Sequence, residues 1–89
     1  MHAIVTVVGN DRVGIIANVC ALLASHQVNI LDINQTIMQG KFTMIMMVDL
    51  DTADESLTEL ATHLKELGDK MGISIRIQRE EIFDAMHEI

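Results

Sequence analysis

The sequence has no tryptophan or tyrosine, only two phenylalanines (Phe42 and Phe83) and few basic residues. Six lysines and arginines stand against thirteen acidic residues, which gives a net charge of −7. Proteins that bind nucleic acid need basic side chains for the phosphates, and those that bind single strands also use aromatic rings on which bases stack. The sequence therefore argues against a nucleic-acid partner and against an anionic membrane surface.

Cysteine is nearly absent as well. Cys20 is the only one, so no disulfide can form within the chain. Its position on the apolar side of a predicted helix favours a buried thiol. The first residues lack the features of a signal peptide, and no apolar run is long enough to span a membrane. We therefore expect a cytoplasmic protein.

Signatures of metal binding and catalysis are missing too. The histidines His2, His26, His63 and His87 are scattered along the chain, and none pairs with another at the spacing of metal ligands. We therefore predict surface histidines and no metal site. The sequence shows no nucleophile paired with a base, so we expect no enzyme activity and no bound cofactor.

What the sequence does contain is an apolar pattern. Apolar residues make up 49% of the 89 positions, which suits one domain with a modest core. Alternating and helical spacings predict strands, helices and a short terminal helix in the order βαββαβα. We expect a single domain over residues 1–89, with a βαββαβ core over 1–79 and a C-terminal helix over 80–89.

Local signals refine these elements. Asp11 is a good N-cap for a first helix that starts near Val13. Thr52 and Glu55 fit a capping box for the second helix, and Gly72 is a plausible stop. In the strand over 28–38, alternation predicts one face formed by Leu31, Ile33 and Ile37 and a more polar face that begins with Ile30.

This order of elements is typical of an α+β, ferredoxin-like sandwich, in which two helices cover one face of a four-stranded antiparallel sheet. Right-handed crossovers give the strand order 4-1-3-2, with the strands at 2–8 and 42–50 in the centre. Both faces of the sheet carry apolar residues, whereas the two long helices cover only one. The terminal helix, another subunit or both must cover the other, and we expect a homodimer.

The stretch from Val8 to Ile16 is the strongest functional signal. It joins a strand to a helix through two glycines, an Asn, an Asp and an Arg. Backbone N–H groups at such a turn suit a carboxylate or a phosphate. The plain structural alternative is that Asp11 only caps the helix and the glycines only form the turn.

This stretch resembles the opening of an ACT domain, a small regulatory module that binds amino acids in metabolic enzymes. The family motif is a strand, then Asp or Asn, Arg, often Pro, then Gly and two aliphatic residues. Here the motif reads Asp11-Arg12-Val13-Gly14-Ile15-Ile16, and Val28-Asn29-Ile30 resembles a second signature. Residues 29–38 and 80–89 are most similar to the small stand-alone ACT proteins known as the UPF0237 family.

The resemblance implies a ligand at a subunit interface. The turn forms one wall, and an Asn at the start of the second strand of a neighbouring subunit forms the other. The implied site comprises Asn10, Asp11, Arg12, Val13, Gly14 and Ile15 of one subunit and Asn29 of its neighbour. Two positions depart from the family pattern: Val13 stands where Pro is frequent, and Gly9 where some ligand-binding members have a polar side chain.

We therefore expect a non-catalytic regulatory module that binds a small ligand such as an amino acid and acts through a partner protein, an enzyme or a regulator. The alternative is a protein-interaction or structural module with a vestigial ligand site. A small-molecule enzyme is a distant third, because the turn carries few acid–base groups.

Overall fold

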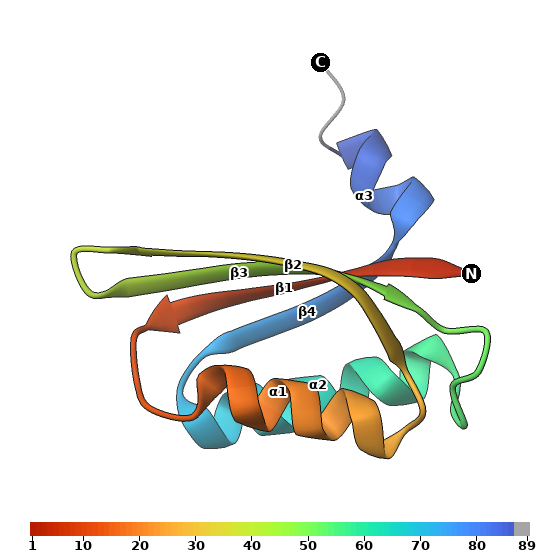
Figure 1. The fold of residues 1–89 in the computed structure, drawn as a ribbon, viewed down its shortest axis with the longest axis horizontal. Helices are drawn as coiled ribbons and strands as arrows, with labels where there is room; N and C mark the ends of the chain where they lie inside the picture. Colours follow the sequence, from red (N-terminus) through yellow and green to blue (C-terminus); the bar gives the residue numbers. More distant parts are fainter. Residues whose placement is uncertain (87–89) are drawn as a thin grey trace.

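The computed structural model describes residues 1–86. Its elements follow the expected order: β1 (His2–Asn10), α1 (Ile15–Ser25), β2 (Asn29–Met38), β3 (Lys41–Asp49), α2 (Leu57–Met71), β4 (Ser74–Arg79) and α3 (Glu80–Met86). The antiparallel strands form one sheet in the order β2-β3-β1-β4, which confirms the ferredoxin-like fold and the 4-1-3-2 order (Figure 1). His87 and Ile89, which the sequence places in the terminal helix, lie outside the described residues.

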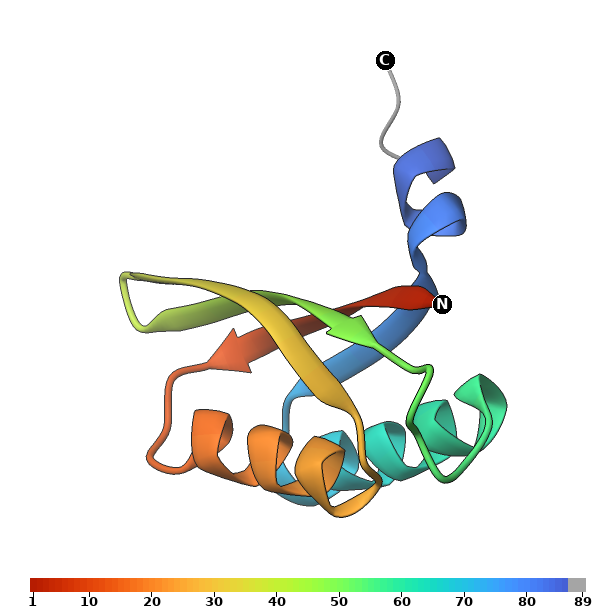
Figure 2. The ribbon, with the colours of Figure 1, turned by 45° about the vertical axis from the view of Figure 1, so that its right-hand side comes forward.

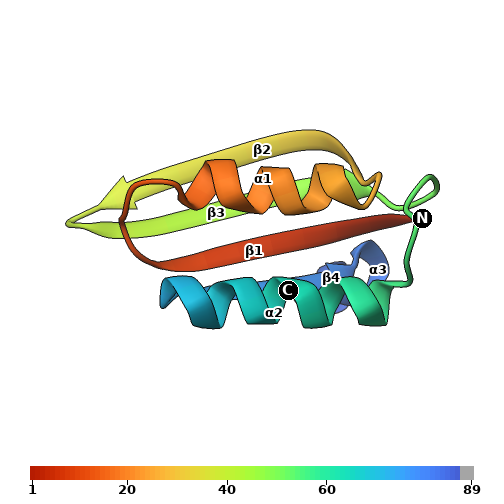
Figure 3. The same cartoon turned by 90° about the horizontal axis from the view of Figure 1, so that it is seen from below.

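The core lies between the sheet and two helices. α1 and α2 run side by side beneath one face of the sheet (Figure 3). Inward-facing residues alternate along β1 and β3, because successive side chains of a strand point to opposite faces. The completely or almost completely buried side chains come from both layers and include Val5, Val7, Ile15, Val19, Leu23, Met44, Met46, Leu60 and Leu64. Because Ile15 and Leu23 are among these buried residues, the core holds α1 near both of its ends.

The opposite face of the sheet is covered only in part. α3 stands on that side, over the N-terminal part of β1 and the end of β4 (Figure 2). Ile4 is buried there, whereas Val8 and Ile45 remain 47% and 41% exposed. The described residues thus leave an apolar surface on this face, as the sequence predicts for a chain with a partner. Among these residues, no helix has the length and apolar character needed to cross a membrane.

The start of α2 differs from the prediction. The capping box of Thr52 and Glu55 is wrong, because the helix begins one turn later. Ser56 is the N-cap: its hydroxyl accepts from the Glu59 N–H at 3.2 Å, and the Glu59 carboxylate accepts from the Ser56 N–H at 3.1 Å. The hydroxyl of Thr52 instead donates to the carbonyl of Gln27. The capping pattern occurs twice in succession, and the sequence alone does not choose between the copies. Gly72, with φ of 72°, ends the helix as predicted.

The faces of β2 also differ from the prediction. Ile30 pairs with Val48 and Asp32 pairs with the next residue of β3, Met47, so Leu31 is an extra residue in a bulge. A bulge shifts the alternation by one residue. Ile30 therefore lies on the helix-covered face together with Ile33, contrary to the simple period-two assignment. As expected, β2 is an edge strand, and its residues beyond Ile30 are exposed.

Candidate functional site

The turn between β1 and α1 is shaped by its backbone rather than by a capping side chain. Gly14 is the N-cap of α1 and adopts φ of 91°, a left-handed conformation that glycine takes readily. No side chain caps the helix, so the prediction that Asp11 is the N-cap is wrong. The first N–H groups of an α-helix have no partner within the helix. This turn therefore presents uncapped amides.

Three contacts with two other segments, the β2–β3 hairpin and the end of α2, hold the turn in place. The N–H of Asp11 donates to the carbonyl of Gly40 in the β2–β3 hairpin at 2.8 Å. The guanidinium of Arg12 donates to the carbonyl of Met71, at the end of α2, at 2.7 Å. The ammonium of Lys41 donates to the side chain of Asn10 at 2.9 Å. The carboxylate of Asp11 has no part in these contacts.

A shallow hollow of about 230 Å³ lies beside the turn. Four of the predicted site residues line it, namely Asp11, Arg12, Gly14 and Ile15. The hollow continues along α1 and across to the sheet, where Gln35, Ile37 and Phe42 complete its lining. Asn10 and Val13 are not among the lining residues, and the side chain of Val13 is 98% exposed. The hollow thus combines polar groups at the turn with apolar groups from β2 and β3.

Asn29 lies at the other end of the molecule. It pairs with Asp49, which itself pairs with His2 at the start of β1. The turn follows Asn10 at the end of that nine-residue strand, which spans about 26 Å at 3.3 Å per residue. The structure therefore does not bring Asn29 to the turn of its own chain.

Gly9 has a packing role that the sequence did not reveal. A Cβ atom at this position would lie 2.6 Å from Cγ2 and 2.9 Å from Cβ of Ile73. Ile73 precedes β4, which pairs with β1. Glycine thus allows the end of β1 to approach Ile73. A polar side chain, which some ligand-binding ACT domains carry at this position, would not fit.

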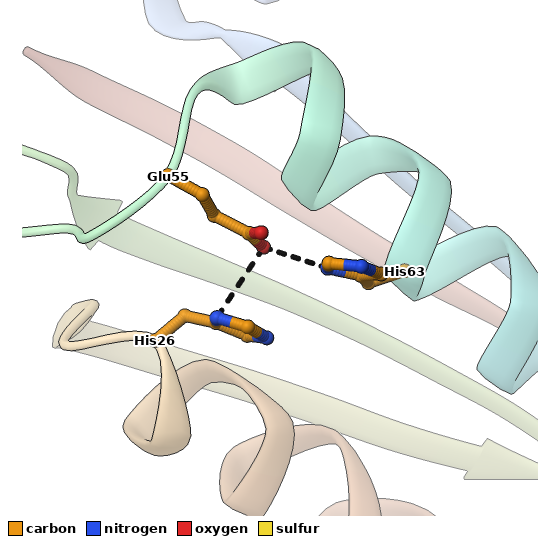
Figure 4. Close-up of side chains that lie close together, drawn as sticks. All are labelled: His26, Glu55 and His63. Atoms are coloured by element: carbon orange, nitrogen blue, oxygen red, sulfur yellow. Dashed lines mark hydrogen bonds and ion pairs between the residues drawn. The ribbon is translucent and has the colours of Figure 1, made fainter.

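A second group of ionisable side chains meets at the far end of α1, where the sequence predicts no site. His26 follows α1, Glu55 lies in the loop before α2, and His63 lies in α2 (Figure 4). Glu55 Oε1 lies 2.8 Å from Nδ1 of His63 and 3.5 Å from Nδ1 of His26. The two rings stack with centroids 5.0 Å apart and an interplanar angle of 11°. The prediction of scattered, unpaired histidines is wrong for these two.

The charges around this cluster favour a cation. The hydrogen bond to Glu55, with the nearby carboxylates of Glu55, Glu66 and Glu59, raises the pKa of His63, although desolvation opposes this. Asp54 Oδ1 lies 3.1 Å from His26 Nδ1. No linear motif reports this meeting, because the three residues come from three separate elements. The only available signal was that His26 follows the first predicted helix and His63 lies within the second, and that these helices are predicted to cover the same face of the sheet.

Comparison with known proteins gives a consistent picture. Residues 1–78 match the model of a family described as ACT domain. The chain belongs to this family. It is 55% identical to a UPF0237 protein of Bifidobacterium longum, over 98% of this chain and 97% of that protein. Its fold matches an ACT domain protein from Streptococcus pneumoniae with a TM-score of 0.82 and 39% identity, over 98% of each chain. Both the ACT assignment and the UPF0237 assignment made from the sequence are confirmed.

The same fold also matches part of a longer protein. This chain aligns with a formyltetrahydrofolate deformylase from Pseudomonas syringae at a TM-score of 0.80 and 26% identity, covering 88% of this chain but only 27% of that protein. The ACT domain is a regulatory domain that binds small ligands.

Proposed function

We propose that this ACT domain is a non-catalytic regulatory module that binds an amino acid at the turn between β1 and α1. The observation that carries the proposal is the uncapped start of α1 beside the hollow lined by Asp11 and Gly14. Helix N-terminal amides suit an α-carboxylate. The carboxylate of Asp11, which caps nothing, suits an α-ammonium group. The apolar side chains of Ile37 and Phe42 can accept the ligand's side chain.

The second half of the site comes from a second copy of the chain. β2 is an edge strand with exposed apolar side chains at Ile33 and Ile37, and such edges readily pair with another strand. Antiparallel pairing of β2 with β2 over its full length would bring Asn29 of the second copy opposite Met38, next to the hollow. This homodimer would close the site and would supply the Asn side chain that the family resemblance implies.

Titration calorimetry of the full chain against the twenty amino acids tests the proposal. We expect heat of binding for one amino acid or a few related ones, and a dimer by light scattering. Asp11→Ala should weaken binding at least tenfold, since a charge-assisted hydrogen bond contributes about 1.5–3 kcal/mol. Asn29→Ala should weaken binding in the same way while the dimer persists.

The matched control is Asp69→Ala, which removes the same charge from the exposed face of α2. It should leave binding unchanged. The proposal fails if no amino acid binds at millimolar concentration, or if Asp11→Ala binds as well as the unaltered chain. Because Asp11 does not cap α1, its replacement should not change stability by more than about 0.5 kcal/mol.

A specific observation also favours a partner protein. Ile82 and Met86 of α3 are exposed, next to the uncovered side of the sheet that carries Val8 and Ile45. We propose that a cytoplasmic enzyme or regulator docks on this surface and receives the ligand signal. Removing residues 80–89 should abolish recovery of one stoichiometric partner in a pull-down but leave amino-acid binding intact. If the truncated chain lost amino-acid binding as well as partner recovery, α3 would instead be needed for the fold.

A further inference from the structure

We propose that His26, Glu55 and His63 bind a divalent transition-metal ion of the Zn²⁺ class and that this ion fastens α1 to α2. One ligand atom from each residue lies within 4.8 Å of the other two. Two imidazole nitrogens and a carboxylate oxygen are a donor set that zinc accepts, with a water molecule as the fourth ligand. This site is separate from the ligand-binding turn and does not rest on the proposed function.

The distances fit this coordination. Around a tetrahedral zinc ion with bonds of about 2.0–2.1 Å, neighbouring ligand atoms lie about 3.3 Å apart. The separations of Glu55 Oε1 from the two Nδ1 atoms, 2.8 Å to His63 and 3.5 Å to His26, lie on either side of that value. The nitrogens lie within 4.8 Å of each other, so coordination requires them to move closer and the two stacked rings to turn toward the ion.

The two rings share a nearby carboxylate oxygen. Both imidazoles place Nδ1 near Glu55 Oε1 (Figure 4). Because the rings are stacked and nearly parallel, they must turn before the in-plane lone pairs of both Nδ1 atoms point at one ion. With no ion, the Nδ1–H of His63 donates to Glu55 Oε1 at 2.8 Å, and the Nδ1–H of His26 donates to Asp54 Oδ1 at 3.1 Å. One divalent ion can replace these N–H protons, because metal binding uses neutral imidazoles and releases protons.

The backbone positions the three ligands firmly. Glu55 directly precedes Ser56, whose capping box fixes the start of α2, and the Glu55 side chain is only 9% exposed. His63 follows within α2, and His26 is the C-cap of α1. The side chains of His26 and His63 are 26% and 42% exposed, so an ion can reach them from solvent.

The surroundings also favour a cation. Asp54 lies beside His26, and Glu66 lies near His63. The two histidines and Glu66 line a groove of about 620 Å³ between α1 and α2, which also includes Lys70. The fourth coordination position faces solvent in this groove and can hold the water molecule. α1 is 11 residues long, so the metal site lies about 16 Å from the uncapped turn.

The test uses the full chain, first freed of metal with a chelator and then titrated with ZnCl₂ in a calorimeter. We expect one Zn²⁺ per chain, a higher melting temperature in Zn²⁺, and no such effect of Mg²⁺, which prefers oxygen ligands. His63→Gln and His26→Gln should each weaken Zn²⁺ binding more than about 100-fold. Loss of a residue that only hydrogen-bonds to a metal ligand costs about 10- to 100-fold, and loss of a ligand itself should cost more.

Two controls separate this site from other metal-binding groups. His2→Gln removes a histidine that also lies near one carboxylate, Glu80, at 3.4 Å, and it should bind Zn²⁺ like the unaltered chain. Cys20→Ser removes the single thiol and should likewise have no effect. In the unaltered chain, the ring-proton resonances of His26 and His63, but not of His2, should shift on addition of Zn²⁺, which tests the assignment without any variant that must fold.

The proposal is overturned if the unaltered chain does not bind Zn²⁺ or if His63→Gln binds it as tightly as the unaltered chain. It is also overturned if the ring resonances of His26 and His63 do not shift when Zn²⁺ is added. Equal loss of binding in His2→Gln or Cys20→Ser also assigns the metal to a different place. Amino-acid binding at the turn should persist without zinc, so failure of one proposal leaves the other intact.

Discussion

The two ends of α1 are built in contrasting ways. At the N-terminal end, consecutive residues form a turn whose backbone groups face a hollow, and the key residue is a glycine without a side chain. At the C-terminal end, His26, Glu55 and His63 meet through their side chains although they belong to separate elements. The first site is local and can be recognised as a motif, whereas the second exists only because α1 and α2 pack side by side.

The contrast extends to electrostatics. The start of α1 offers uncapped N–H groups, which suit an anion. The cluster at its other end has more carboxylates than cations around its imidazoles, and the negative end of the helix dipole lies nearby. One helix thus separates a turn whose charge distribution suits an anion from a cluster whose charge distribution suits a cation. The following predictions test the structural basis of each end, from the largest expected effect to the smallest.

Gly9→Ala should have the largest effect at the turn end. The added methyl group would lie within 3 Å of Ile73, and such overpacking costs about 1–3 kcal/mol of unfolding free energy. Urea denaturation measures the loss. In an Ile73→Ala background the same change should cost less, because Cγ2, the closest clashing atom at 2.6 Å, is gone, although Cβ at 2.9 Å remains. Equal costs in the two backgrounds would contradict the close-approach explanation.

Arg12→Ala should come next, with a loss of about 1.5 kcal/mol of unfolding free energy. The guanidinium donates to the carbonyl of Met71 and is the side-chain link between the turn and the end of α2, and hydrogen bonds of charged groups are worth this much. Lys41→Ala is the matched control, because Lys41 bonds only the exposed Asn10 nearby, and it should change stability by less than about 0.5 kcal/mol. Similar losses for both variants would show that the Met71 contact is unimportant.

Ser56→Ala tests the other end and should cost about 1 kcal/mol of unfolding free energy through loss of the N-cap. Because Ser56 directly follows Glu55, the change should also loosen the cluster and weaken Zn²⁺ binding. Thr58→Ala, two residues along the same exposed turn, is the control and should be neutral within about 0.5 kcal/mol. If Thr52→Ala rather than Ser56→Ala lowered helix content, the capping assignment would be wrong.

The smallest effect should be the pH dependence of that capping box. The N–H of Ser56 and its hydroxyl contact hold the pKa of Glu59 below its ordinary value of 4.5. A lowered pKa in the folded state stabilises the fold above the ordinary value and loses that effect as pH falls through the lowered one. Stability differences between the unaltered chain and Glu59→Gln should therefore be largest near neutral pH and shrink below about pH 4.5. A difference that grows on acidification would contradict this.

The corrections to the predicted elements share a physical cause. Thr52 and Ser56 both begin a capping-box pattern, and packing rather than local chemistry selects Ser56. The bulge at Leu31 shifts the faces of β2, because one extra residue cannot be seen in the alternation itself. Asp11 is a good N-cap by residue type, yet its backbone is bonded to Gly40 and the helix starts later at Gly14.

The sequence by itself determined the fold class, the strand order and the family. Alternating apolar residues, two helical stripes and right-handed crossovers leave one arrangement, and the motif at residues 11–16 is contiguous. Only the tertiary structure decided that Gly9 packs against Ile73 and that His26, Glu55 and His63 meet. Local patterns are encoded by neighbours along the chain, whereas contacts between helices and loops depend on how finished elements pack.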